Sequence, residues 1–474
     1  MAPLRVLVIG LDGASFNLIG PWLKKKVLAN LADIVKNGVS GPLESWLPPV
    51  TCPCWKCYST GLNPGKLGVY WWQMVDVERR RIQTPNSRSF HGKEIWDYLS
   101  EAGFSSGVLN MPTTYPPKPV RGFLVSGGPM ALEFNYTYPA RLERRLKRIG
   151  YKVHPDAQMI TQEYIKEHFD EFLKLFELRF KVAYKLANEF NVDFLHITIF
   201  YINVLHHFLW DHPLVRKAWE FIDDLIGWIL SAWSPDDLII LSDHGSGPIR
   251  GVFAINAWLR AQGYLHLGHK GTKKLFVRLG ITRERLGALL PISLLDRLRR
   301  FRVKSVFRSL LPPAVGDIDW DSSKVIGLGQ GPVYLIGVSR NTPDYEALRE
   351  ELIRRLEALR NPRTGESIIV RAHRAEELYG TLRGLAPDII LEPAPGYHIE
   401  GNVAAKKVLD EPDRWVAENA KYGIFVFHGD HFKKGLRVHG VRITDIAPTV
   451  LRLFGIEAPK HLDGRPLIDF LAGR

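Results

Sequence analysis

Two stretches of the chain place side chains that can hold a divalent cation directly after apolar runs. Asp12 follows the run VLVIGL and precedes Gly13, and Asp243 with His244 follows LIILS and precedes Gly245. Carboxylate and imidazole groups suit divalent metals, and a neighbouring glycine lets the backbone turn sharply. Each aspartate could instead cap the turn or helix after it. Because there are two such stretches, one of them Asp-His, the pattern favours a metal site.

Thr51 lies in a third stretch, 47–55, which reads LPPVTCPCW. Pro53 suits the first turn of a helix, so we expect Thr51 at a helix N-terminus, where orphan N–H groups and the helix dipole favour anions. A hydroxyl bound to a metal at that position could ionise and attack phosphorus. The plainer interpretation is that Thr51 is an ordinary N-cap.

The cysteines of the chain, Cys52, Cys54 and Cys57, lie within the same stretch. Three cysteines so close together cannot form a disulfide framework, which indicates a reducing compartment. We interpret them as small packing residues, since a C-x-C-x-x-C metal site would need a fourth ligand. The first residues turn apolar at once and meet Asp12 too early for a signal peptide, so we expect a cytoplasmic protein.

The composition describes a folded globular chain that is long enough for a large core or two domains. It has 474 residues, of which 46% are hydrophobic and 24% charged. No stretch long enough to span a membrane is free of strongly polar groups, and no nucleic-acid-binding motif occurs. Only six glutamines stand beside 63 Lys and Arg and 50 Asp and Glu, a balance in the direction expected of a thermophilic source.

Short apolar runs that alternate with helical stretches predict an α/β fold. We expect strands at 5–11, 107–110, 122–125, 193–200, 237–241, 388–391 and 423–427, and helices over 164–191 and 213–233. Runs that are apolar on both faces suit a largely parallel central sheet covered by helices on both sides. Since ligands gather past the carboxyl ends of such strands, Asp12, Asp243 and His244 are expected at one edge of the sheet.

The segment 265–317 interrupts this alternation and carries most of the net charge. It holds 12 Lys and Arg against 3 Asp and Glu, whereas the whole chain has a net charge of +13. We therefore predict core residues 1–264, a small basic helical insertion or cap at 265–317, and core residues 318–474. The insertion could pack over the site or draw an anionic surface toward it.

Together these stretches resemble the alkaline phosphatase superfamily, and within it the type I phosphodiesterase and nucleotide pyrophosphatase family. The resemblance spans nearly the whole chain in order and spacing. Its motifs are Ile9-Gly10-Leu11-Asp12-Gly13, Pro48-Pro49-Val50-Thr51 with Trp55, Thr60-Gly61, Asn63-Pro64-Gly65, Pro112-Thr113-Thr114-Tyr115-Pro116-Pro117, Ser242-Asp243-His244-Gly245, Ala386-Pro387-Asp388, Asp445-Ile446-Ala447-Pro448-Thr449 and Leu462-Asp463-Gly464-Arg465.

The resemblance implies an alkaline-phosphatase-like core and a two-metal hydrolase, with Zn²⁺ or Mn²⁺, acting on a small phosphoester. Matched residue by residue, the first ion would be held by a set that this chain has in full: Asp12, Thr51, Asp243 and His244. Thr51 would be the nucleophile that takes the phosphoryl group, and a water would later remove it.

The second ion would be held by residues matching Asn203, His207 and Asn419, where the family has Asp, His and His. An amide carbonyl binds divalent metal weakly compared with carboxylate or imidazole, so the sequence supports one ion and leaves the second in question. With one ion, release of a phospho-Thr51 intermediate would need another base. His207 and its neighbour His206 are candidates, although one could be buried and bonded and the other exposed.

Other interpretations stay open at this level. Sulfatase chemistry is disfavoured because the arginine of its C-x-P-x-R motif is missing after Pro53. Tyr70, Trp71 and Trp72 could stack on a base or sugar, or simply fill a core. The rival to a hydrolase is a degenerate, non-catalytic relative that keeps one metal and binds an anionic ligand or partner.

Overall fold

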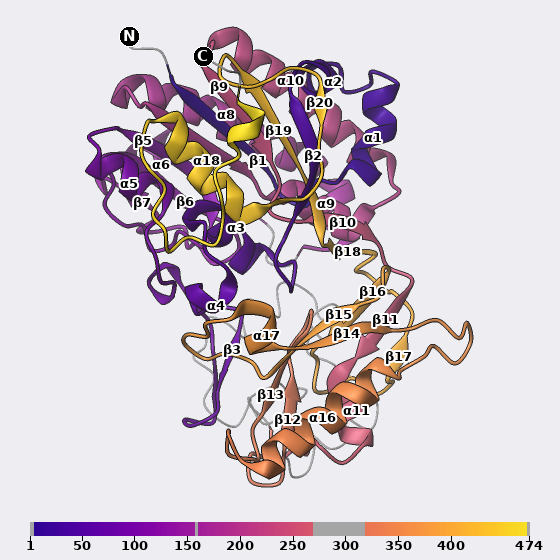
Figure 1. The fold of residues 1–474 in the computed structure, drawn as a ribbon. Coiled ribbons are helices and arrows are strands. Elements are labelled where there is room, and N and C mark those ends of the chain that lie inside the picture. The colour runs from indigo at the N-terminus through magenta and orange to yellow at the C-terminus, as the bar shows by residue number, and fades with distance from the viewer. Residues whose placement is uncertain (1–3, 157–159, 269–317, 472–474) are drawn as a thin grey trace. The chain divides into compact units, whose positions relative to one another are not determined.

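The computed structural model describes residues 4–156, 160–268 and 318–471 and confirms a mixed α/β fold. The chain divides into two compact units (Figure 1). Unit 1 consists of Met1–Val69, Pro85–Pro248 and Arg414–Arg474, and unit 2 of Tyr70–Thr84 and Ile249–Asp413. The metal-ligand candidates of the sequence all lie in unit 1.

Unit 1 is built around a ten-stranded sheet in the order β20-β2-β19-β9-β1-β8-β5-β6-β7, with β21 beside β2. Neighbours from β9 to β6 run parallel, whereas β19 is antiparallel to both β2 and β9. The bounds are β1 Val6–Leu11, β2 Val39–Glu44, β5 Ser106–Pro112, β6 Gly122–Gly127, β7 Thr137–Tyr138, β8 Phe194–Ile199, β9 Asp237–Leu241, β19 Tyr422–Gly429, β20 Leu436–Arg437 and β21 Val441–Arg442. A separate pair joins β10 Gly245–Pro248 to β18 Ala417–Ala420.

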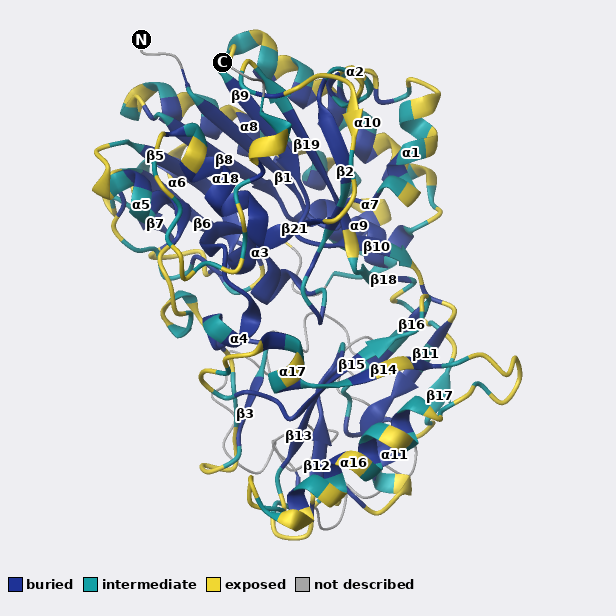
Figure 2. Ribbon diagram, viewed as in Figure 1, coloured by how far each residue is buried: buried dark blue, intermediate teal, exposed yellow. Residues whose placement is uncertain are grey.

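Helices cover both faces of this sheet, as the sequence predicted. The helices are α1 Phe16–Lys24, α2 Ala29–Asn37, α3 Thr51–Thr60, α4 Pro64–Leu67, α5 Ile95–Glu101, α6 Arg141–Arg148, α7 Gln162–Glu167, α8 Phe169–Phe190, α9 Tyr201–Leu209, α10 Pro213–Ala232 and α18 Ile446–Leu453, with 3₁₀ turns η1 Ser87–Ser89, η3 Ile443–Asp445 and η4 Ile468–Phe470. One face packs on α2, α8, α9 and α10, and the other on α3, α5 and α18. The central strands β1, β8 and β9 between them are buried throughout (Figure 2).

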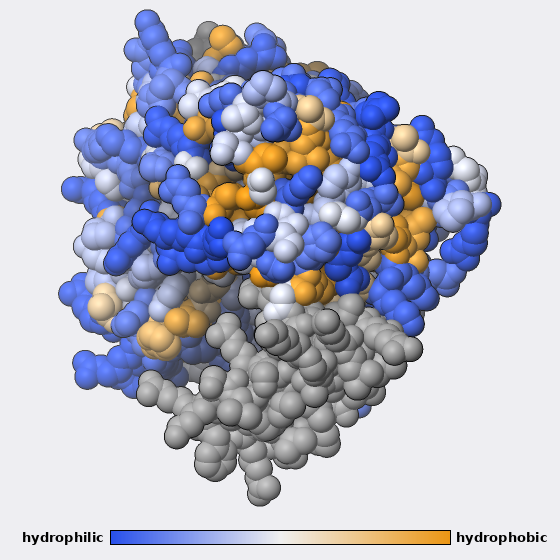
Figure 3. All heavy atoms as spheres, turned by 90° about the horizontal axis from the view of Figure 1, so that it is seen from below, coloured by the Kyte–Doolittle hydropathy of each residue, from blue (hydrophilic) through white to orange (hydrophobic). Residues whose placement is uncertain are grey.

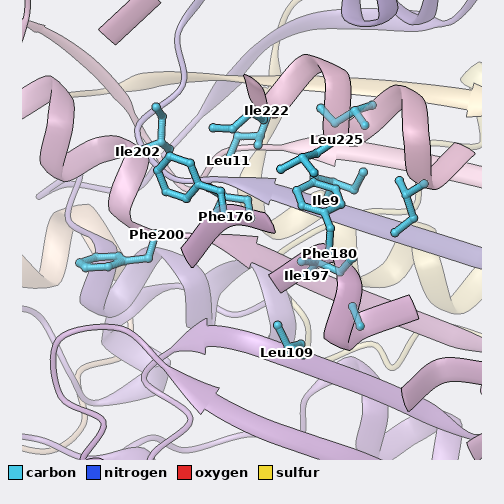
Figure 4. Close-up of a cluster of buried hydrophobic side chains, with 14 of the residues drawn as sticks. Ile9, Leu11, Leu109, Phe176, Phe180, Ile197, Phe200, Ile202, Ile222 and Leu225 are labelled. Carbon is cyan, nitrogen blue, oxygen red and sulfur yellow. The ribbon is translucent and has the colours of Figure 1, made fainter. Parts of the chain in front are cut away.

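Side chains of β1 show how one strand serves both cores. Leu7, Ile9 and Leu11 belong to the apolar cluster on the α8 and α10 side, where Phe176 and Phe180 meet them (Figure 4). Val6 and Val8 belong to the cluster on the α3 side. Because side chains alternate along a strand, a strand buried on both faces is a continuous apolar run. This is why VLVIGL predicted a central strand.

The parallel strands β9, β1 and β8 end level with one another. In register, Gly10 of β1 lies opposite Leu241 of β9, and Leu11 lies opposite Ile199 of β8. Asp12, Asp243 and helix α9 follow directly, so all three arrive at one edge of the sheet. The tertiary structure thereby brings together residues that are far apart in the chain, such as Gly13 and Asp243, which are separated by 230 positions.

Two sequence-predicted strands have other surroundings than expected. The run at 388–391 is strand β15, Ile389–Pro393, which belongs to an antiparallel sheet of unit 2 and not to the central sheet. The run at 423–427 joins the central sheet as the antiparallel strand β19. The helical stretch 164–191 is divided into α7 and α8, and β2 has no counterpart in the prediction because its sequence, VSGPLE, lacks a continuous apolar pattern.

Unit 2 has its own apolar core around a four-stranded antiparallel sheet, β12-β13-β15-β14. Two smaller sheets, β16-β11-β17 and β3-β4, complete it. Its elements are β3 Met74–Asp76, β4 Arg81–Gln83, β11 Gly251–Ala254, α11 Ile255–Ala261, β12 Val325–Gly327, β13 Pro332–Leu335, α16 Pro343–Glu357, β14 Ile369–Arg374, α17 Ala375–Tyr379, β15, β16 Tyr397–Glu400 and β17 Leu409–Asp410.

Most of the predicted basic insertion, from residue 269 to residue 317, lies outside the described residues. Its helical structure, its role as a cap and its contact with an anionic surface therefore stay predictions. Within the described part of the chain, every helix is too short or too polar to cross a membrane. On the face shown in Figure 3, hydrophobic patches are broken up by hydrophilic residues.

Candidate metal centre

The four residues predicted for a first ion meet at the carboxyl edge of the unit 1 sheet. Ligand atoms of Asp12, Asp243 and His244 all lie within 4.8 Å of one another. Thr51 Oγ1 lies 3.1 Å from His244 Nε2 and 3.5 Å from Asp12 Oδ1. All four side chains are almost fully buried. The set therefore offers oxygen and nitrogen donors at one point, which is the requirement for a divalent cation.

The residue after Asp12 has to be a glycine for two reasons, its backbone conformation and the lack of room for a side chain. Gly13 has a φ of +68°, in the left-handed region that side chains with a Cβ disfavour. A Cβ at this position would also lie 2.1 Å from Asn203 Oδ1. The Gly13 N–H points back to the site, 3.4 Å from Asp243 Oδ1. The turn thus ties the end of β1 to the aspartate that follows β9.

Thr51 is the first residue of α3, and Val50 before it is the N-cap in extended conformation. The interpretation of Thr51 as an ordinary N-cap is wrong, since the N-cap is Val50. No side chain caps this helix start. The Thr51 hydroxyl is directed instead at Asp12 and His244. Pro53 lies in the first turn, as expected, where its missing N–H costs no helical bond. The N–H groups that begin α3 are therefore beside the ligand cluster.

The charge balance of the cluster indicates a cation. Burial raises the pKa of Asp12 well above its ordinary value and raises the pKa of Asp243 to about 8. Among the described residues, neither carboxyl pairs with a lysine or arginine. His244 Nδ1 donates to the Gly245 carbonyl at 2.8 Å, so Nε2 carries its lone pair 3.2 Å from Asp243 Oδ2. Two carboxyls and a nitrogen lone pair that face one another fit a bound divalent ion.

The residues predicted for a second ion also lie together, but they are bonded to one another. Asn203 Nδ2 lies 3.1 Å from His207 Nε2 and 3.4 Å from Asn419 Oδ1. His207 Nδ1 donates to the Ala417 carbonyl at 2.7 Å, so its Nε2 accepts the bond from the Asn203 amide. The imidazole lone pair that an ion would need is thus engaged by an amide N–H. These three residues do not fit a second divalent ion as they stand.

The alternative in which His206 or His207 is exposed is wrong, because both are buried. His206 accepts the Trp219 Nε1–H at 3.0 Å, and its Nδ1 lies 3.2 Å from Ser246 Oγ. Burial lowers the pKa of His206 well below its ordinary value, so this imidazole is neutral. His207 stacks on Trp415 with ring centroids 3.8 Å apart. Of the two, only His207 contacts the Asn203 side of the candidate site.

Several neighbours of the cluster could not be found from local sequence. Ser45 donates a short hydrogen bond to the Asp243 carbonyl, and Ser246 donates to the Gly13 carbonyl at 2.6 Å. Glu418 is a buried residue whose charge only partly offsets the lowering of the His244 pKa by burial. Trp55 donates its Nε1–H to Asp12 Oδ2 at 2.8 Å. Of these neighbours, only Trp55 could be expected from the sequence, since it lies four residues, or about one helical turn, after Thr51.

The remaining candidates of the sequence lie elsewhere or play other parts. The three cysteines are free and buried, and none belongs to the ligand group. Tyr70 and Trp71 belong to unit 2, where the Tyr70 hydroxyl donates to the Arg383 carbonyl and Trp71 Nε1 donates to Gln330, both at 2.9 Å.

Comparison with known proteins agrees with this architecture. Residues 6–429 match the model of the type I phosphodiesterase/nucleotide pyrophosphatase family. Murine ectonucleotide pyrophosphatase/phosphodiesterase 5 has a similar fold, with a TM-score of 0.56 at 15% identity over 99% of this chain and 100% of that chain. Phosphonoacetate hydrolase from Sinorhizobium meliloti 1021, solved with phosphonoacetate, gives a TM-score of 0.61 at 14% identity over 95% of each chain. No curated protein sequence matches the chain.

The family match covers most of the chain, and the solved relatives share the fold from end to end. The family is one of phosphoester hydrolases. The buried group of Asp12, Asp243 and His244 is a candidate site for a divalent metal ion. This chain belongs to the type I phosphodiesterase/nucleotide pyrophosphatase family of the alkaline phosphatase superfamily.

Proposed function

We propose that this protein is a metal-dependent hydrolase of phosphodiesters or pyrophosphates in which Thr51 is the nucleophile. The position of Thr51 supplies the main support. Its hydroxyl lies 3.1 Å from His244 Nε2, at the start of a ten-residue helix and beside two buried carboxyls. A murine relative solved with AMP is described as an inactive variant in which a threonine is replaced by alanine. Diesters are preferred over monoesters because of the family.

The ion, Zn²⁺ or Mn²⁺, would be held by Asp12, Thr51, Asp243 and His244. When bound, it would lower the pKa of the threonine hydroxyl and offset negative charge on the phosphoryl group. The protein's part is to keep these donors oriented. His244 is fixed by its bond to the Gly245 carbonyl, and Asp243 by the Gly13 N–H and by Ser45.

In the first step, the Thr51 hydroxyl loses its proton and its oxygen attacks phosphorus. A bond from Oγ to phosphorus forms, the bond to the leaving oxygen breaks, and the leaving oxygen takes up a proton from solvent. The N–H groups at the start of α3 can donate to the phosphoryl oxygens, whose negative charge the helix dipole also favours. Because Thr51 is buried on a helix that packs on the sheet, the nucleophile approaches from a defined direction. The product of this step is a phospho-Thr51 intermediate.

In the second step, water attacks the phosphorus, the bond to Thr51 breaks, and the threonine hydroxyl recovers a proton. His207 is our candidate for the base that takes the proton from this water. Its Nδ1–H donates to the Ala417 carbonyl, so its lone pair is on Nε2, where it accepts the bond from the Asn203 amide. For this step the water has to replace the Asn203 amide as the partner of Nε2.

We further propose that one ion per chain is sufficient. Asn203, His207 and Asn419 form a neutral hydrogen-bonded group where the family has a second set of ligands. Two amides carry no charge to hold a divalent cation, and the imidazole nitrogen is already bonded. The same observation favours the second candidate function, a non-catalytic relative that keeps one ion and binds an anionic ligand.

Turnover and ion content of the purified protein test both proposals. With Zn²⁺ or Mn²⁺ added, we expect hydrolysis of bis-p-nitrophenyl phosphate and one ion per chain by elemental analysis. Thr51→Ala should lower kcat by several orders of magnitude, because the substitution removes the attacking hydroxyl. Thr60→Ala is the matched control, since this hydroxyl, at the other end of α3, donates to the Lys56 carbonyl.

The outcomes separate the two candidate functions. Retention of more than about a tenth of the activity in Thr51→Ala would remove Thr51 from the mechanism. One tightly held ion without turnover of diesters or pyrophosphates would favour the non-catalytic relative. Two ions in the wild-type protein would contradict the assignment of Asn203 and Asn419.

A further inference from the structure

Trp55 is a buried tryptophan of α3 whose ring nitrogen is bonded to a candidate metal ligand. Its Nε1–H donates to Asp12 Oδ2 at 2.8 Å, and its side chain has no exposed surface. Trp55 and Thr51 are separated by about one helical turn, so they lie on the same side of α3. One helix therefore contacts both oxygens of Asp12, through Thr51 at Oδ1 and through Trp55 at Oδ2.

The space for this indole is provided by Gly10 on β1. A Cβ at Gly10 would lie 2.4 Å from Trp55 Cη2, closer than any side chain tolerates. The ring is held on other sides by Tyr58 and His196, with centroids 5.8 Å and 5.7 Å away in edge-on packing. Tyr58 is itself bonded to His196 Nδ1 at 3.0 Å. These contacts fix the position of the indole ring and therefore the direction of its N–H.

Because of the bond to Trp55, the two oxygens of Asp12 have different partners. Oδ2 is engaged by the indole, whereas Oδ1 faces Thr51 Oγ1 at 3.5 Å and His244 Nε2 at 3.7 Å. A carboxylate that is held at one oxygen in this way can offer the other oxygen at a fixed angle. Partners that orient a ligand often decide metal affinity almost as much as the ligand itself does.

We propose that Trp55 is a positioning residue that fixes Asp12 as a one-oxygen ligand and thereby sets the affinity for the ion. This inference rests on the proposed function only in that an ion binds at Asp12, and it does not require turnover. Through Trp55, the helix that carries the proposed nucleophile would also build the ion site. A movement of α3 would then alter both together.

Trp55→Phe tests this proposal because phenylalanine keeps an aromatic ring and removes the donor. Trp96→Phe is the matched control: Trp96 is also fully buried, belongs to the same apolar cluster, and its Nε1 has no hydrogen-bond partner within the described structure. The measurement is the dissociation constant for Zn²⁺, by competition with a chelator, on each full-length variant. The unfolding temperature of the metal-free proteins shows the cost of the lost ring atoms.

We expect Trp55→Phe to weaken Zn²⁺ binding by about 10- to 100-fold, the usual effect of losing a partner of a metal ligand. Trp96→Phe should change it by no more than about twofold, with a comparable loss of metal-free stability. If the two variants bind Zn²⁺ equally tightly, Trp55 is only a packing residue and the proposal is wrong.

Should Trp55→Phe fail to fold, benzothienylalanine at position 55 keeps the bicyclic ring and replaces the N–H by sulfur. Weakened Zn²⁺ binding by that protein would support the proposal, and unchanged binding would overturn it. The two levels of inference can be separated. A wild-type protein that binds Zn²⁺ but hydrolyses no phosphoester would refute the proposed function and leave the role of Trp55 standing, whereas one that binds no ion would refute both.

Discussion

At the scale of single residues, the candidate site depends on the difference between an acid and its amide. An asparagine has nearly the size of an aspartate but carries no charge, and it lacks the imidazole nitrogens of a histidine. In exchange, the Asn203 amide can donate to His207, which an aspartate could not do. Asn203, His207 and Asn419 therefore form a neutral hydrogen-bonded group.

The double variant Asn203→Asp with Asn419→His should restore a second ion site. A carboxylate and two imidazoles are far better ligands than two amides and one imidazole, so we expect the ion content to rise from one toward two per chain. Elemental analysis after gel filtration measures this. Asn188→Asp is the control, since it adds the same charge on α8 and keeps the oxygen that accepts the Trp233 Nε1–H. An ion content that stays at one would contradict the assignment of this group.

At the scale of elements, the candidate site depends on the packing contact between β1 and α3. β1 delivers Asp12, α3 delivers Thr51, and the indole of Trp55 fills the gap between them above Gly10. Strand β1 is central, with parallel neighbours on both sides, so it cannot shift to make room. The packing of Trp55 between β1 and α3 is therefore sensitive to a single carbon added at Gly10.

Gly10→Ala should destabilise the protein by about 1–3 kcal/mol, the usual cost of overpacking a core. The added Cβ would displace an indole that Asp12, Tyr58 and His196 hold, so Zn²⁺ binding should weaken as well. Chemical denaturation and a chelator competition measure the two effects. Gly247→Ala is the control because a Cβ there meets nothing within 4 Å, and its effect should stay within about 0.5 kcal/mol. Equal stability of the two variants would refute the tight packing of Trp55 on Gly10.

At the scale of the whole molecule, the buried titratable groups couple folding to pH and to the ion. The carboxyls of Asp12 and Asp243 have raised pKa values because of burial, and for Asp243 the value is about 8. The folded, metal-free chain therefore keeps protons that the unfolded chain has released above about pH 4. Since the folded state binds more protons, these groups lose their stabilising effect as pH rises toward 8.

Buried histidines act in the opposite direction at lower pH. Burial lowers the pKa of His196 to about 3 and lowers the pKa values of His206 and His244 as well. Below about pH 6.5 the unfolded chain takes up protons on these histidines that the folded chain refuses, so stability falls as pH falls. The two effects oppose each other up to about pH 6.5, and above it only the carboxyl effect remains.

The metal-free protein should therefore lose stability between about pH 6.5 and pH 8, by up to about 1.4 kcal/mol per pH unit for each protonated carboxyl. Saturating Zn²⁺ should abolish this loss, because the ion takes the place of the protons and binds only the folded state. Thermal unfolding across this range, with and without Zn²⁺, measures the effect. Asp243→Asn, which is neutral at every pH, should show a flatter dependence. A metal-free protein whose stability rises toward pH 8 would contradict the charge state described for the site.

The sequence by itself determined the fold class and the first group of site residues. Runs such as VLVIGL are apolar on both faces, so they had to be central strands, and polar residues that follow parallel strands must lie at one edge of the sheet. The local pattern alone was therefore sufficient to group Asp12, Asp243 and His244. The local sequence also pointed to Thr51 as a hydroxyl at a helix N-terminus. The family motifs added its expected role as nucleophile and the positions of Asn203, His207 and Asn419.

Only the tertiary structure decided which partners these side chains have. That β15 belongs to a sheet of unit 2, that both His206 and His207 are buried, and that Trp55 rather than solvent contacts Asp12 depend on residues far apart in the chain. Local pattern reports which face of an element is apolar, but it carries no information about what is packed against that face. Hydrogen bonds such as that of Asn203 with Asn419, 216 positions apart, arise only when the sheet has closed around its helices.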